Sequence, residues 1–260
     1  MSKISQVESS ISKISAQFQE QPHVRLLGKK SWVFPLQLAE IQMKTVVRSQ
    51  MDVLMKMILK ILDRLEVKLA REISELLAVE TIFVEHMLEL MMQNKMVAKM
   101  EDTFQLTTSG LAQLTQGTFE HDPTEEQVEI TYSPLHHDVL NLDIEHSLVD
   151  DDEEVPNYEF EKDVNMVVVD KLDDSKIRQM IEGSGYEFLV EKGQILIEEI
   201  LSVELKENLR PICFEFHLYD KTEDIFFVRV WNTWTGKFDV HLESEINHNE
   251  AVKLRKQYNL

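Results

Sequence analysis

Apolar residues recur at helical spacing in the first twenty positions of the chain. They stand three and four positions apart, at Ile4, Val7, Ile11, Ile14 and Phe18. This repeat is typical of the seam of a coiled coil and predicts a helix with one apolar stripe. About two and a half heptads are too few for a stable coil on their own. The stripe therefore packs either on the protein's own core or on a partner chain or second copy.

A second helical pattern begins near Leu36 and runs to about Leu65. Its apolar positions follow the i, i+3, i+4, i+7 rule, at Met51, Leu54, Met55, Ile58, Ile61, Leu62 and Leu65. The first part of this stretch, Leu36 to Met43, is either continuous with that helix or a separate one. Just before it, the residues from Trp32 to Pro35 are typical of a short extended segment.

The next segments alternate between helical and extended patterns. Residues 68–77 predict a short helix with Leu69, Ile73 and Leu76 facing inward. After a tight turn at 78–79, residues 80–94 predict another helix whose apolar positions are Ile82 or Phe83, Val84, Met87, Leu88 and Met91. Residues 96–100 and 104–107 predict a hairpin with its turn at 101–102, and a further helix begins at Thr108.

This order resembles the winged helix-turn-helix domains of MarR-like and PadR-like regulators over residues 45–117. The resemblance rests on three segments, 73–79 (ISELLAV), 94–97 (NKMV) and 106–110 (LTTSG). It implies that the helix after the turn enters the major groove of DNA, with the wing on the backbone or minor groove. Ala78 replaces the glycine frequent in the turn, and Glu80 replaces the Ser or Thr that caps the third helix.

The third predicted helix lacks the side chains that read bases. Its outer face carries Glu80, Glu85 and Glu89, and no Lys or Arg occurs between residues 80 and 94. Glutamates repel phosphates, so we expect the module to bind protein, with these three residues as contacts. The alternative is a DNA-binding regulator with a basic face. Its candidate nucleic-acid contacts are Lys56, Lys60 and Lys99.

Acidity is concentrated after this module. Residues 121–162 contain 14 acidic residues and one basic residue, including the run from Asp150 to Glu154. This composition predicts a solvated acidic connector, within which residues 128–132 are typical of a strand ended by Pro134. His136 and His137 suggest a metal site, but their spacing matches none of the standard sites, and we predict no metal ligand. The acidic run alternatively mimics a nucleic-acid backbone in a basic groove.

The C-terminal part predicts an α+β domain with an antiparallel meander. Residues 166–169 suggest a buried strand, residues 173–182 a helix capped by Asp173, and residues 195–207 a strand. Residues 211–220 alternate well, residues 225–231 follow after a hairpin loop, and residues 248–258 predict a final helix. Glu204 and Lys206 form a Glu-x-Lys, as in metal-dependent nucleases that also need an upstream acid such as Asp170. This is a second, weaker alternative.

These patterns predict an α+β chain in four parts. They are an N-terminal helix and extended segment (1–35), a mainly helical winged-helix domain (36–120), the acidic connector (121–162) and the α+β domain (163–260). No apolar run reaches membrane-spanning length, and the first twenty residues lack the basic and apolar regions of a signal peptide, so we expect a cytoplasmic protein without membrane contact. We predict no catalytic residue and no cofactor. The expected partner is a protein with a basic surface, a second copy remains a candidate, and nucleic acid is disfavoured by charge.

Overall fold

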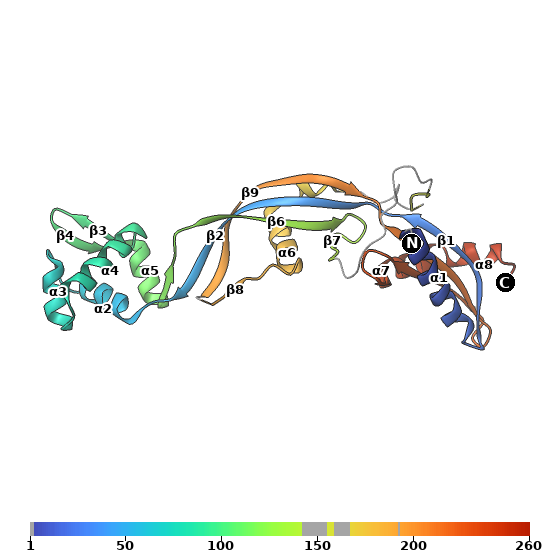
Figure 1. The fold of residues 1–260 in the computed structure, drawn as a ribbon, viewed down its shortest axis with the longest axis horizontal. Coiled ribbons are helices and arrows are strands. Elements are labelled where there is room, and N and C mark those ends of the chain that lie inside the picture. The colour runs from blue at the N-terminus through green and yellow to red at the C-terminus, as the bar shows by residue number, and fades with distance from the viewer. Residues whose placement is uncertain (1–2, 142–154, 159–166, 192) are drawn as a thin grey trace. The chain divides into compact units, whose positions relative to one another are not determined.

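The computed structural model describes residues 3–141, 155–158, 167–191 and 193–260 (Figure 1). The chain is an α+β protein with antiparallel sheets. It divides into two compact units. Unit 1 comprises residues 1–41, 128–185 and 203–260, and unit 2 comprises residues 42–127 and 186–202. The run from Asp150 to Glu154 lies outside the described residues.

A four-stranded sheet in the order β1-β10-β11-β12 forms the centre of unit 1. The strands are β1 (Val24–Val33), β10 (Ile212–Asp220), β11 (Ile225–Asn232) and β12 (Lys237–Phe238). Strands β10 and β11 are joined by the hairpin loop expected at 221–224, which confirms that part of the meander. Helix α1 (Lys3–Gln19) packs on one face, where Phe18 and Phe216 share a buried cluster.

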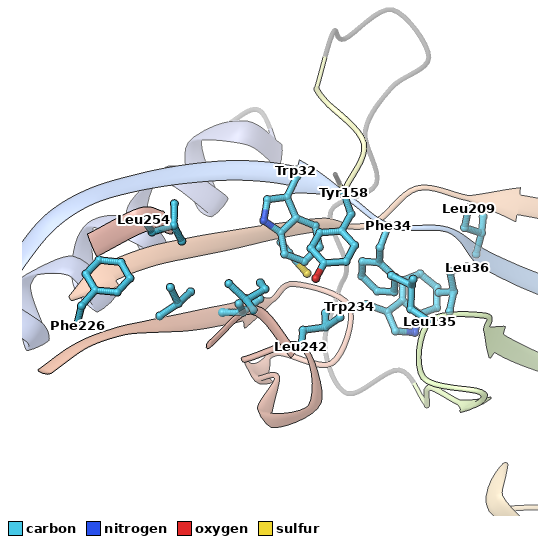
Figure 2. Packing of buried hydrophobic residues seen from close by; sticks show 14 residues of the cluster. Trp32, Phe34, Leu36, Leu135, Tyr158, Leu209, Phe226, Trp234, Leu242 and Leu254 are labelled. Carbon is cyan, nitrogen blue, oxygen red and sulfur yellow. The ribbon is translucent and has the colours of Figure 1, made fainter. Parts of the chain in front are cut away.

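Helices α7 (Val240–Asn249) and α8 (Ala251–Gln257) contribute to a second apolar cluster, drawn in Figure 2. Val228, Val230 and Leu242 are fully buried in it. Successive side chains of β10 enter the two different clusters, so the strand is covered on both faces. Residues 155–158 reach the end of β1, where the Trp32 and Tyr158 rings lie 4.6 Å apart between centroids. The terminal helix predicted at 248–258 is α8, which begins three residues later, and α7 precedes it.

A second sheet follows the order β7-β6-β2-β9-β8, with β5 paired to β2. Its strands are β2 (Leu36–Gln50), β5 (Thr118–Glu120), β6 (Thr124–Ser133), β7 (Asp138–Val139), β8 (Leu189–Val190) and β9 (Gly193–Leu209). Three of the four divisions between the units fall within strands, namely β2, β6 and β9. Helix α6 (Asp174–Gly183) begins as expected, because the Asp173 carboxylate accepts a hydrogen bond from the Lys176 amide at 2.8 Å.

Two secondary-structure predictions were wrong. The helix expected from Leu36 to about Leu65 exists only over Val53–Leu62, because residues 36–50 form strand β2. Ala39, Ile41 and Met43 alternate with more exposed polar residues, which is the period of a strand. The strand expected at 166–169 is also absent over its described residues, since Val169 begins the short 3₁₀ helix η2 (Val169–Lys171).

Unit 2 contains four helices and a hairpin between strands β2 and β5. They are α2 (Val53–Leu62), α3 (Ala70–Leu77), α4 (Thr81–Gln93), β3 (Val97–Met100), β4 (Thr103–Leu106) and α5 (Thr108–Gln116). One cluster with Ile58, Leu59, Ile73 and Leu88 fully or almost fully buried forms the core. The hairpin is held to α5 at Thr107, whose hydroxyl donates to the Lys95 carbonyl at 2.6 Å and accepts from the Gly110 amide at 3.0 Å.

Candidate interaction surface

The turn between α3 and α4 is fixed by side-chain hydroxyl groups. The Ser74 hydroxyl donates to the Val79 carbonyl at 2.7 Å, and the Thr81 hydroxyl donates to Ser74 at 3.0 Å. Ala78 adopts the left-handed conformation, with φ at 53°, and its amide donates to the Ser74 carbonyl. The left-handed residue ends α3 in the way glycine usually does. A sequence without glycine therefore still makes the tight turn predicted at 78–79.

Helix α4 buries one side and exposes another that is partly apolar. Val84, Leu88 and Met91 are buried in the core of unit 2. In contrast, Ile82 is 66% exposed and Phe83 is 58% exposed. Neither of these two side chains therefore belongs to the buried side of the helix. Burial of Val84 directs them outward, since neighbouring helix positions are about 100° apart.

Helix α3 exposes apolar side chains as well. Ile73 is buried as predicted, but Leu69 and Leu76 are 61% and 60% exposed, so their predicted inward positions were wrong. Twelve of the seventeen large apolar residues that are exposed in the described chain belong to unit 2, although it is the smaller unit. Exposed apolar residues that gather into a patch mark interaction surfaces.

The charges on the α3–α4 surface are almost all negative. Glu80, Glu85 and Glu89 are exposed. Among the described residues, none of their side-chain carboxylates has a hydrogen-bond or ion-pair partner. The one cation of this surface, Arg71, is paired with Glu75 at 2.7 Å. Helix α4 itself contains no Lys or Arg. The surface therefore combines apolar side chains with uncompensated negative charge, and we define it by Leu76, Ile82, Phe83, Glu80, Glu85 and Glu89.

The three lysines expected to contact nucleic acid are all exposed, but they lie on different elements. Lys56 and Lys60 are one turn apart on α2. Lys99 lies on β3, where its ammonium group is 5.4 Å from the centroid of the Phe104 ring. Arg48, which could have joined a basic face, is paired with Glu120 at 2.6 Å. Of the three predicted lysines, only Lys56 and Lys60 lie close together, and Lys99 lies apart from them on the wing.

The N-terminal stripe is covered by the protein itself where it is described. Ile11, Ile14 and Phe18 are 7–9% exposed and pack with Phe216 and Leu218 of β10. This agrees with the first of the two expectations for the stripe. The side chains of Ile4 and Val7 lie outside the described ones.

A buried Ser-His-Asp arrangement in unit 1 was not foreseen from the sequence. The Ser133 hydroxyl lies 2.6 Å from His136 Nδ1, and His136 Nε2 lies 3.0 Å from Asp239 Oδ2. Asn232 also donates to Asp239 at 2.8 Å, and Asp239 caps helix α7. Burial disfavours the Asp239 carboxylate, but His136 and Asn232 outweigh that effect and lower its pKa.

The access to this arrangement decides what it can do. A pocket of about 480 Å³ reaches His136 and Asp239, but Ser133 is fully buried and does not line it. A nucleophile must come within contact distance of its substrate, and Ser133 cannot do so in this conformation. The three residues instead connect the β6–β7 loop to the start of α7. Only the adjacent histidines at 136 and 137 hinted at this in the sequence.

A second buried network surrounds Glu215 on β10. Its carboxylate accepts hydrogen bonds from the Trp32 indole at 2.8 Å and from His217 at 2.7 Å, and Lys30 lies 3.2 Å away. His217 also bonds the Tyr258 hydroxyl at 2.8 Å. Burial disfavours the Glu215 carboxylate, but His217 and Lys30 outweigh it and lower its pKa. The network attaches the end of α8 to the sheet.

The Glu-x-Lys motif forms an ion pair on the surface of the sheet. Lys206 contacts both Glu204 and Glu40 at 2.9 Å. The hydrogen bond from Lys206 lowers the pKa of Glu204. Charged pairs of this kind are ordinary on solvated strands. Among the described residues, no group of three His, Cys, Asp or Glu side chains is placed to hold a metal ion.

Comparisons with known proteins identify no relative of this chain. No protein-family model, no curated protein and no solved structure matches the chain. Within the described part of the chain, every helix is too short or too polar to cross a membrane.

Proposed function

We propose that this chain is a non-enzymatic interaction protein that binds a protein partner through the α3–α4 surface of unit 2. Helices α2 to α4, the β3–β4 hairpin and α5 are interpreted here as a winged-helix module that begins at Val53. In this interpretation α4 is the helix that would enter a DNA groove and β3–β4 is the wing. The partner carries a basic contact surface, in keeping with the glutamates it meets.

One observation carries the proposal. The exposed side of α4 places Ile82 and Phe83 beside Glu85 and Glu89 without a single cation. Phosphate contacts need Lys, Arg or amide donors, and each glutamate here adds repulsion. Apolar side chains at the centre of a surface, surrounded by charges, are the arrangement found in protein interfaces. A protein partner can bury the apolar side chains and pair with the glutamates, whereas a DNA duplex can do neither.

The proposal is tested by comparing two pairs of substitutions in the full chain. Ile82→Ser with Phe83→Ser removes the apolar centre of the surface. Val240→Ser with Val252→Ser, at residues 73% and 70% exposed in unit 1, is the matched control. We expect a partner recovered from the native cell, then purified, to bind wild type and control equally. The first variant should bind at least about tenfold more weakly.

Duplex DNA provides the opposing measurement. We expect the purified wild-type chain not to bind duplex DNA at low salt, where electrostatic attraction is strongest. Tight binding that weakens as salt rises and is lost in Lys56→Glu with Lys60→Glu would overturn the proposal. It would favour the alternative, a winged-helix DNA-binding regulator. Equal partner binding by both serine variants would also contradict the assignment of the surface.

A further inference from the structure

The outer sides of α2 and α4 carry the same pattern with opposite charges. On α2, Val53 is followed by Lys56, Met57 and Lys60 at three, four and seven positions. On α4, Ile82 is followed by Glu85, His86 and Glu89 at the same three, four and seven positions. Residues at these spacings share one helix face. Each helix therefore has an apolar end followed by two like charges one turn apart.

Both faces are exposed to solvent. Val53 and Met57 are 75% and 43% exposed, and Ile82 is 66% exposed. All four charged residues of the two faces are exposed, and none has an ion-pair partner among the described residues. A folded chain gains little from leaving two such faces in water, since their apolar ends remain solvated. The two faces are complementary in charge and equal in length.

One chain cannot bring these two faces together. Helix α2 buries Met55, Ile58, Leu59 and Leu62, and α4 buries Val84, Leu88 and Met91, all in the same cluster. The faces opposite to these residues point away from that shared core. Pairing the cationic face with the anionic face therefore requires a second molecule. The molecule that carries both faces at the same spacing is another copy of this chain.

We propose that two copies of this chain associate, with α2 of one copy packed on α4 of the other. This rests on the proposed function, because it names the partner of the α3–α4 surface. The contact joins two different faces of the chain, one from each copy. Lys56 and Lys60 meet Glu85 and Glu89 in either relative direction of the helices, because both pairs are four positions apart. Phe83 and Leu76 border the contact.

The test uses charge reversal in the full chain and the molar mass in solution. Wild type is expected to shift with concentration from the 30.4 kDa of one chain to twice that mass. Lys56→Glu with Lys60→Glu leaves both faces negative, and Glu85→Lys with Glu89→Lys leaves both positive. Each variant alone should associate at least about tenfold more weakly than wild type, since like charges now face each other. Glu125→Lys with Glu191→Lys, at exposed glutamates elsewhere in unit 2, makes the same change in net charge as Glu85→Lys with Glu89→Lys. This control should associate like wild type.

Mixing the two reversed variants decides the matter. Every contact between the two variants joins a negative face to a positive face, so the mixture should regain the wild-type association. The proposal is overturned if wild type stays a single chain at the highest concentration measured, or if the mixture does not associate. Should either result occur while Ile82→Ser with Phe83→Ser still abolishes binding of another protein, the proposed function stands and the partner is not a second copy. If the chain binds DNA and Lys56→Glu with Lys60→Glu abolishes that binding, the α2 face binds nucleic acid instead of a second copy.

Discussion

The Thr81 hydroxyl donates a hydrogen bond to the Ser74 hydroxyl at 3.0 Å, and Ser74 in turn donates to the Val79 carbonyl at 2.7 Å. This chain of two bonds connects the last turn of α3 with the first turn of α4 across the connection that contains Ala78. Ser74 is only 8% exposed, so its bonds are shielded from water. The relative placement of Leu76 and Ile82 on the proposed surface depends on this connection.

Removing the Ser74 hydroxyl should destabilise unit 2. Ser74→Ala leaves the Val79 carbonyl and the Thr81 hydroxyl without this partner, which costs about 1–3 kcal/mol in free energy of unfolding. Thr115→Ala is the control, since the Thr115 hydroxyl bonds the Leu111 carbonyl at an exposed site, and it should change stability by less than about 0.5 kcal/mol. Urea unfolding followed by circular dichroism measures both. Equal effects of the two substitutions would show that the Ser74 bonds contribute little.

Replacing Ala78 should have the opposite effect. Its φ of 53° lies in the left-handed region, which costs a residue with a Cβ roughly 1–2 kcal/mol. Ala78→Gly relieves that strain but adds freedom to the unfolded chain, so the net gain is expected to be about 0.5–1 kcal/mol. A rise in the thermal midpoint of the full chain checks this. A fall would indicate that the Ala78 methyl group makes a contact worth more than the strain.

The sequence predicts local structure well where one period dominates. Residues 68–116 show separate helical and alternating stretches, and the helices and hairpin were found there with small shifts of their ends. The first strand of the second sheet was missed for a physical reason. Apolar residues at Leu36, Ala39 and Met43 fit the helical spacing, whereas Ala39, Ile41 and Met43 fit the alternation of a strand. Pairing with other strands decided between the two patterns.

Exposure of side chains was harder to predict than the elements themselves. A helix of apolar residues with three glutamates does not reveal which side is buried until its neighbours are known. Ile82 and Phe83 were counted among the apolar positions of this helix, and their exposure is what defines the candidate surface. The Ser133–His136–Asp239 contact joins residues more than a hundred positions apart, so only tertiary structure can show it.

A glycine substitution tests the attachment of the hairpin to α5. A Cβ atom on Gly110 would lie 2.1 Å from the Met96 carbonyl oxygen, which is far inside contact distance. Gly110→Ala should therefore destabilise unit 2 by about 1–3 kcal/mol through overpacking. Gly183→Ala is the matched control, because nothing lies within 4 Å of its Cβ position and the residue is helical. It should be neutral or stabilising by up to about 1 kcal/mol, and comparable losses in both variants would contradict the close approach.

The buried pair of His136 and Asp239 should give unit 1 an acid-dependent stability. The pKa of Asp239 is lowered from 3.8 in the folded chain: burial opposes this, but the His136 hydrogen bond and charge prevail. A lowered carboxyl pKa adds stability that is fully present above pH 3.8 and is lost as pH falls through the folded value. Glu215, lowered from 4.5, acts in the same direction. Asp239→Asn keeps the shape of the side chain but removes its charge. It should cost about 3 kcal/mol at neutral pH and reduce the steepness of acid unfolding. Denaturant unfolding measured from pH 7 downward would contradict this if the difference in free energy between wild type and Asp239→Asn did not shrink below pH 4.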